Sequence, residues 1–323
     1  MAGKIKKIIR FAIVIACFSY IISFFYKEKG NLELLLELRV SYLALILLLG
    51  VLYLFVHCYR FKIIIEKCSG SSLSFWKWFR IFSQARFLNI VIPQLGNIYR
   101  GISLKKFFNI SYTNYISAFA SFAWMDTCFN LLVATAIISL FARDLKIGRF
   151  NALGLLSVLT VLIITTPVLM KLVLSKLPIR AKKLAWLKGR VNEVLHATIT
   201  NLKDVKYFLI INSLGLLVMV RTILIYYILF YSLGVQPQIV ALLLFYALFK
   251  ISSFFIITPG NIGIQEIAFG FLSDQLGIGM AEGILVCVIG RVVGTLVVII
   301  FGVATGGISV LRHKEDYLEQ NEL

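Results

Sequence analysis

Charged side chains lie in parts of this sequence that are otherwise strongly apolar. Ionisable groups in apolar surroundings are rare, and they usually have a binding or transport role. The residues in question are Arg86, Arg100, Asp126, Arg221, Lys250, Glu266 and Arg291. An arginine guanidinium pairs well with phosphate, and a carboxylate can orient it or bind a cationic group. We therefore expect a site for a phosphate-bearing group. Its candidates for positive charge are Arg100, Lys250 and Arg291, and its candidates for counter-charge are Asp126 and Glu266.

A purely structural role is the alternative for some of these charges. Asp126 and Glu266 could form ion pairs that only fix the packing of neighbouring segments. Arg221 lies near the end of its apolar stretch, where a long side chain can reach the membrane surface. It is therefore the weakest candidate of the set.

Two apolar stretches that contain such charges are interrupted by proline and glycine. One runs from Asn89 to Arg100 and includes Pro93, and the other runs from Phe255 to Glu266 and includes Pro259. Proline removes a backbone donor and obstructs the preceding helical turn. Helices that restart near Gly96 and Asn261 would present free N–H groups and a positive dipole end, which suit an anion such as phosphate. The alternative is a pair of proline kinks that only adjust helix packing.

The composition indicates an integral membrane protein. Hydrophobic residues make up 60% of the 323 residues, mean hydropathy is +0.91, and several apolar runs reach the length of about 20 residues that crosses a bilayer. We expect an all-α, polytopic helical bundle of about eight spans. The expected spans are residues 8–26, 40–58, 112–142, 151–174, 207–232, 238–258, 262–276 and 283–311. The first is interpreted as a retained span, because it is too long for a signal-peptide core.

The distribution of basic residues predicts the orientation. The segments 1–10, 59–110, 171–206 and 312–314 hold 24 of the 33 Lys and Arg residues. The positive-inside rule places these segments, and both termini, in the cytoplasm, and we expect the plasma (inner) membrane. The formal net charge of +18 then reflects contact with anionic lipid at that face rather than nucleic-acid binding.

The interrupted stretches suggest an internal repeat within a single membrane domain, residues 1–323. Each interruption would be a re-entrant hairpin, one covering 73–106 from the inside and the other 238–275 from the outside. Inverted repeats covering about 8–142 and 151–311 would follow, as in many secondary transporters. Between the repeats, an amphipathic loop helix in 175–206 is expected at the cytoplasmic surface, and residues 312–323 form a short tail.

At these residues the sequence resembles the flippase-like integral membrane domain of lysylphosphatidylglycerol synthases, over nearly the whole chain. One family motif is matched by Arg86, Asn89, Pro93, Gly96, Asn97 and Arg100; a second by Pro259, Gly260, Asn261, Gly263 and Glu266; and a later arginine by Arg291. Asn97 stands where the family usually has an acid, which puts proton or cation coupling there in doubt. Asn261 replaces a glycine and restricts that turn. The aminoacyl-transferase domain of the full-length synthases is not within this sequence, so we expect no lysyl-lipid synthesis.

The resemblance implies translocation of a lipid with a phosphate-containing headgroup, either a phospholipid or a polyprenyl-phosphate-linked sugar. Two alternatives stay open: an intramembrane transferase that uses a lipid-linked donor, and a non-transporting partner of a membrane glycosyltransferase. We find no catalytic or metal-binding motif, and we expect no cofactor. The expected substrate-binding residues are Arg86, Asn89, Arg100, Asp126, Lys250, Asn261, Glu266 and Arg291. The expected helix-breaking residues are Pro93, Gly96, Pro259, Gly260 and Gly263.

Overall fold

The structure is a computed structural model. It describes residues 40–92, 94–176, 189, 192, 204–252 and 261–312. Pro93, Pro259 and Gly260 lie outside the described residues. So do the expected first span 8–26, almost all of the amphipathic helix in 175–206, and the tail after residue 312.

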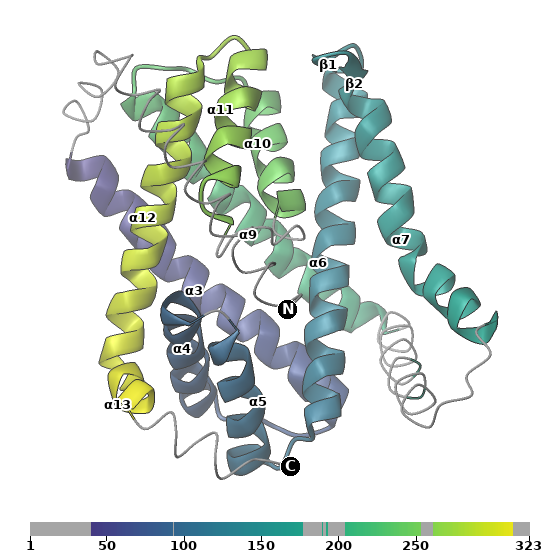
Figure 1. Cartoon of the computed structure of the whole chain (residues 1–323), viewed down its shortest axis with the longest axis vertical. Helices are drawn as coiled ribbons and strands as arrows, with labels where there is room; N and C mark the ends of the chain where they lie inside the picture. The colour runs from purple at the N-terminus through teal and green to yellow at the C-terminus, as the bar shows by residue number, and fades with distance from the viewer. Residues whose placement is uncertain are drawn as a thin grey trace, which may run out of the picture. The chain divides into compact units, whose positions relative to one another are not determined.

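The described residues form an all-α membrane bundle, which confirms the expected fold class (Figure 1). The helices are α3 (Val40–Ser69), α4 (Phe75–Val91), α5 (Leu95–Phe108), α6 (Tyr112–Phe141), α7 (Ala152–Lys176), α9 (Val205–Ser232), α10 (Ile239–Ser252), α11 (Ile264–Gln275), α12 (Met280–Ala304) and α13 (Gly307–Arg312). A short antiparallel pair, β1 (Lys146–Ile147) and β2 (Phe150–Asn151), closes the turn between α6 and α7.

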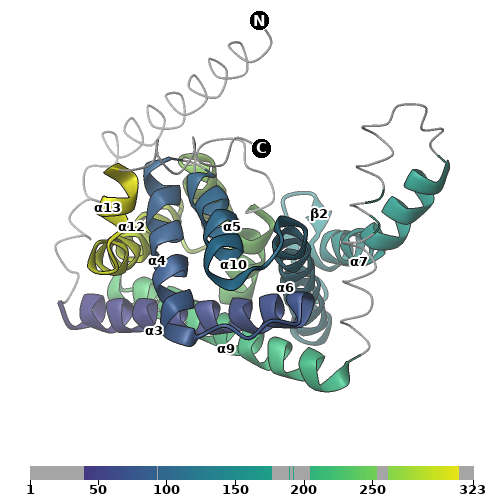
Figure 2. The same cartoon turned by 90° about the horizontal axis from the view of Figure 1, so that it is seen from below.

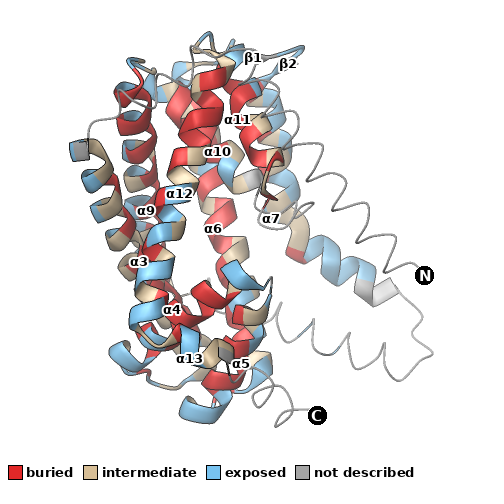
Figure 3. Cartoon of the chain, turned by 60° about the vertical axis from the view of Figure 1, so that its left-hand side comes forward, coloured by how far each residue is buried: buried red, intermediate tan, exposed pale blue. Residues whose placement is uncertain are grey.

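Among the described residues, five helices are long and apolar enough to cross a membrane: α3, α6, α7, α9 and α12. Large apolar side chains such as Val158, Val161 and Leu162 are exposed along α7, as contact with lipid tails requires. In Figure 3 the visible part of α7 beyond its first turns is largely exposed, whereas α10 and α11 are mostly buried.

Two expected spans end differently in the structure. The span expected over 40–58 continues as helix to Ser69, which brings Arg60 into α3. The span expected over 283–311 is interrupted: α12 ends at Ala304, Gly306 has φ +91°, and α13 starts at Gly307. Only glycine adopts that backbone conformation readily, so the chain turns there instead of continuing one helix.

The described chain divides into two compact units. Unit 1 comprises Met1–Val51, Val133–Leu155 and Met219–Val297, and unit 2 comprises Leu52–Leu132, Leu156–Val218 and Val298–Leu323. The five long helices contribute residues to both units. Each unit draws on both halves of the sequence, so neither coincides with one of the two expected consecutive repeats. The inverted repeat stays a prediction.

In unit 2, α4 and α5 pack against each other as a helical hairpin, and α13 packs against α4 (Figure 2). Gly96 allows the close approach of the two hairpin helices. A Cβ atom at this position would lie 1.7 Å from the Ala85 carbonyl oxygen. Gly302 and Gly307 make room in the same way for the Phe87 side chain, which lies on α4.

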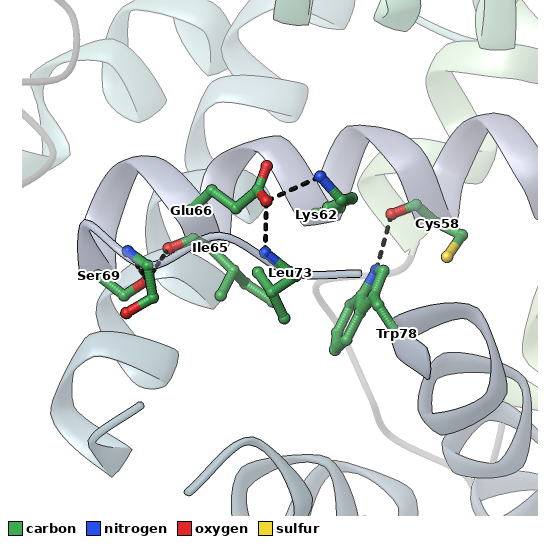
Figure 4. Close-up of polar contacts among 8 residues, drawn as sticks. Cys58, Lys62, Ile65, Glu66, Ser69, Leu73 and Trp78 are labelled. Atoms are coloured by element: carbon green, nitrogen blue, oxygen red, sulfur yellow. Dashed lines mark hydrogen bonds and ion pairs between the residues drawn. The ribbon is translucent and has the colours of Figure 1, made fainter. Parts of the chain in front are cut away.

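The start of α4 is fixed to the second half of α3 (Figure 4). Trp78 is fully buried, and its indole N–H donates to the Cys58 carbonyl at 3.0 Å. Glu66 accepts hydrogen bonds from the Lys62 ammonium at 2.7 Å and from the Leu73 backbone N–H at 2.6 Å. These contacts hold the turn between the helices and thereby set the position of the hairpin.

In unit 1, α10 and α11 pack together and form a second pair of short helices (Figure 1). Phe245 of α10 lies against Phe269 of α11, with ring centroids 5.3 Å apart. Gly283 brings α12 close to α11, because a Cβ there would lie 2.6 Å from the Phe269 carbonyl oxygen.

Candidate anion-binding site

The turn between α4 and α5 is built from uncharged polar side chains. Gln94 has φ +71° and precedes α5, which begins at Leu95. The Asn89 side-chain oxygen accepts a hydrogen bond from the Gly96 backbone N–H at 2.8 Å and so satisfies one free donor of the α5 N-terminus. Asn97 donates to the Gln94 side-chain oxygen at 2.7 Å. The helix α5 thus begins at Leu95, next to the restart expected near Gly96, and Gly96 lies within its first turn.

Arg100 is buried on α5, with 5% of its surface exposed. Its guanidinium carbon lies 5.3 Å from the ring centroids of both Phe61 and Phe82. The Nε atom is buried and makes no hydrogen bond, and no described residue forms an ion pair with this side chain. A buried charge without a counter-charge is unfavourable unless a ligand or solvent compensates it.

Arg86 lies on α4 beside the same aromatic ring. Its guanidinium carbon is 5.7 Å from the Phe82 centroid and 5.2 Å from that of Tyr53. The Nη1 atom is buried and makes no hydrogen bond. Arg86 and Arg100 repel each other electrostatically, and in the described part of the chain neither has an acidic partner. The hairpin therefore holds two neighbouring positive charges.

Every described carboxylate of unit 2 is already engaged by another cation. Glu66 pairs with Lys62 at 2.7 Å, Asp204 pairs with Lys67 at 2.5 Å, and Asp126 pairs with Arg60. The hydrogen bond from Lys67, with a second from the Tyr207 backbone N–H, holds the pKa of Asp204 below its usual value. No described acid of this unit is left to neutralise the two hairpin arginines.

Arg60 is a residue that the sequence analysis missed. It is 1% exposed, it donates through Nε to the Ile211 carbonyl at 3.0 Å, and its Nη1 atom bonds to Asp126. Asp126 therefore pairs with Arg60, which was not among the expected site residues. The apolar residues Phe61 and Ile63–Ile65 just beyond it, on either side of Lys62, were the available signal that the helix, and the burial, continue past residue 58.

In the described part of the chain, the buried hydroxyl groups that make no hydrogen bond include those of Ser83 on α4, Ser103 on α5 and Tyr115 on α6. Ser83 precedes Arg86 by three residues on α4, and Ser103 follows Arg100 by three residues on α5. Residues three apart are neighbours on one helix face. The Tyr115 hydroxyl, from α6, lies close to Arg100. The hairpin thus offers hydroxyl groups beside both charges.

Unit 1 holds a second charged cluster, which is neutral within itself. Arg291 of α12 contacts Glu266 of α11 at 2.8 Å and donates to the Gln265 side-chain oxygen at 2.7 Å. The other carboxylate oxygen of Glu266 accepts from the Gly263 N–H at 2.7 Å, which caps α11. The Asn261 carbonyl lies 3.5 Å from Arg291. The cluster fixes α11 against α12.

The remaining candidates make local contacts in unit 1. Lys250 lies over the Tyr246 ring at 5.5 Å, and Arg221 donates to the Leu49 carbonyl at 2.9 Å. Asn261 and Gly263 both have positive φ, at 54° and 86°. The regular helix α11 starts only at Ile264, three residues later than expected. Within the described ranges, no group of three or more His, Cys, Asp or Glu side chains could hold a metal ion.

These features define an integral membrane protein built from long apolar helices and two pairs of short helices. The sequence model of the family described as "Lysylphosphatidylglycerol synthase TM region" matches residues 7–302. The chain belongs to this family, as its motifs had suggested. No curated protein and no solved structure matches it.

Proposed function

We propose that this protein translocates a membrane lipid and holds the phosphate of its headgroup at Arg86 and Arg100. Membership of a family named for lysylphosphatidylglycerol synthesis supports a role connected with membrane lipids. The observation that carries the proposal is the charge imbalance of the α4–α5 hairpin. Arg86 and Arg100 have no acidic partner among the described residues, while each described carboxylate of unit 2 is paired. Guanidinium groups in this state are suited to phosphate.

The burial of the site favours a lipid headgroup over a surface-bound ion. Arg100 lies on the short helix α5, against the rings of Phe61 on α3 and Phe82 on α4. A headgroup could reach this polar position while its acyl or prenyl chains stay in the bilayer. Backbone interruptions such as the one before α5 are tolerated at membrane depth where they are buried in protein or line a polar cavity.

Leaflet transfer in proteoliposomes tests the proposal. The purified protein should accelerate the transfer of a fluorescent phospholipid, measured by chemical quenching of the outer leaflet. Arg100→Gln should lower the rate at least about tenfold, because a charged hydrogen bond to phosphate contributes about 1.5–3 kcal/mol. Arg149→Gln, which changes an exposed arginine between β1 and β2, is the matched control and should keep the wild-type rate.

Two outcomes would contradict the proposal. An Arg100→Gln protein that transfers lipid at the wild-type rate would remove this arginine from the site. Lipid binding without any transfer by the wild-type protein would instead favour the non-transporting partner of a membrane enzyme.

A further inference from the structure

We infer that the α4–α5 site is selective for a headgroup with two negative charges, that is, a phosphate monoester or a diphosphate. The inference rests on the proposed function, because it assigns the substrate class of the same site. It predicts weaker binding of phosphodiester headgroups with one negative charge. Headgroups that carry an ammonium group should bind more weakly still.

The charge balance of unit 2 carries the first step. Arg86 and Arg100 contribute two positive charges that no described carboxylate neutralises. Arg60 is a further buried arginine of the unit, but Asp126 compensates its charge. A bound group with two negative charges would balance the charges of Arg86 and Arg100. A group with a single charge would leave one guanidinium uncompensated in an apolar setting, which is unfavourable.

The hydroxyl groups carry the second step. Each hairpin helix presents an arginine and a serine three residues apart, and all four side chains have a buried polar atom without a hydrogen bond. The pairs are Ser83 with Arg86 and Arg100 with Ser103. A terminal phosphate has three oxygens that accept strong hydrogen bonds, whereas a phosphodiester has two non-bridging oxygens. Two guanidinium groups and two hydroxyls therefore match a terminal phosphate better.

The absence of an available carboxylate carries the third step, for the described part of the chain. The side chains at the hairpin turn, Asn89, Gln94 and Asn97, are amides without charge. An ammonium-bearing headgroup needs an acidic acceptor, and it would be repelled by the two arginines. Glu266 does not supply one, because both of its oxygens are used within unit 1.

Terminal phosphate occurs on lipids and on soluble molecules, and the test must separate the two. The probes are phosphatidic acid, phosphatidylglycerol and lysyl-phosphatidylglycerol with identical acyl chains, and glycerol 3-phosphate as the soluble phosphate monoester. Dissociation constants are measured at pH 8 on the full chain in detergent micelles. At this pH a phosphate monoester, with a second pKa near 6, is a dianion.

We expect phosphatidic acid to bind about tenfold more tightly than phosphatidylglycerol, with lysyl-phosphatidylglycerol the weakest lipid. Arg86→Gln should bring the dissociation constants of phosphatidic acid and phosphatidylglycerol close to each other, because only the positive charge of Arg100 is then left to compensate the headgroup. Arg149→Gln should keep the wild-type ratio of these two constants. Glycerol 3-phosphate should compete poorly with phosphatidic acid. Competition as strong as that of the lipid would assign the site to a soluble phosphate and overturn the lipid class.

The inference and the proposed function fail differently. Equal or tighter binding of phosphatidylglycerol or of its lysyl derivative, with lipid transfer still dependent on Arg100, would overturn the inference alone. Unaltered lipid transfer by Arg100→Gln would overturn the proposed function. Arg86→Gln could also keep both a wild-type Tm and the wild-type ratio of the dissociation constants for phosphatidylglycerol and phosphatidic acid. That result would show that charge compensation at the hairpin does not set the preference for phosphatidic acid.

Discussion

Arg60 and Asp126 place a complete ion pair inside unit 2, with 1% and 9% of their residue surfaces exposed. The Asp126 backbone carbonyl also accepts a hydrogen bond from Asn130 at 2.5 Å, and Gly215 leaves space for the Arg60 guanidinium. Removal of one partner of a buried pair leaves a charge that nothing compensates. The pair therefore keeps the Arg60 charge compensated inside unit 2.

We predict that Asp126→Ala destabilises the protein by about 3–5 kcal/mol, because Arg60 stays buried without its carboxylate. Thermal unfolding of the purified protein in detergent measures the change as a lower Tm. The double variant Arg60→Met with Asp126→Leu removes both charges and fills similar volume. It should be clearly more stable than Asp126→Ala, since apolar replacement of a whole buried pair is often neutral. A double variant as unstable as the single one would contradict a role for charge compensation.

For individual residues, the sequence was a better guide to which charged side chains are buried or paired than to the partner of each one. Glu266 does lie against Arg291, whereas Asp126 lies against Arg60, which was not among the candidates. Partners on different helices depend on helix rotation and depth, which one sequence does not specify. Arg100 was a candidate because of its position after the proline, but its lack of an acidic partner among the described residues is visible only in three dimensions.

The α4–α5 hairpin is the element that positions the candidate site, and its geometry depends on one close contact. Gly96 lies against the Ala85 carbonyl, so the two helix backbones approach more closely than any side chain would permit. The Asn89 side chain, which caps α5, lies beside the same contact. A change in the spacing of the helices would separate Arg86 from Arg100.

We predict that Gly96→Ala lowers stability by about 1–3 kcal/mol or more, because the added Cβ would overlap backbone atoms that cannot rotate away. Gly294→Ala is the matched control in α12, where no atom lies within 4 Å of the added Cβ. It should be neutral or stabilising by up to about 1 kcal/mol, since alanine is the better helix former. Tm values in detergent measure both variants. Equal Tm values would show that the hairpin is not tightly packed at Gly96.

The helices themselves were predictable from long apolar runs, and their ends were not. The run through residues 283–311 is largely apolar, with Arg291 as its only charged residue, yet Gly306 separates α12 from α13. The signal was the Gly306-Gly307 pair, which is also compatible with close packing inside one helix. Tertiary contacts decide between these outcomes: α13 packs on α4, and the Thr305 carbonyl accepts hydrogen bonds from Arg80 and Gln84.

For the whole molecule, the lengths of the short helices limit how the chain can cross the membrane. At about 1.5 Å per residue, the 17 residues of α4 span ~25 Å and the 14 residues of α5 span ~21 Å. The 14 residues of α10 span ~21 Å and the 12 residues of α11 span ~18 Å. Each is shorter than a hydrocarbon core of about 30 Å, so a pair that enters and returns suits them better than two crossings.

We therefore predict that both ends of each hairpin are reached from the same side of the membrane. Single cysteines replace exposed residues at those ends in a background without the native cysteines. The positions are Lys77 and Lys105 for the first hairpin, and Ile239 and Asp274 for the second. A membrane-impermeant thiol reagent should label the first two from the cytoplasmic side, where basic residues concentrate. If the halves are inverted, it should label the other two from the opposite side.

The pattern of labelling separates the two parts of this prediction. Lys77→Cys and Lys105→Cys labelled from opposite sides would mean that the α4–α5 pair crosses the membrane, so its interrupted turn would not be a re-entrant tip. All four positions labelled from one side would keep both hairpins but contradict the inverted repeat, because inversion requires the hairpins to enter from opposite faces. In that case the Arg86 and Arg100 site could still bind a headgroup, but the symmetry expected for alternating access would be missing.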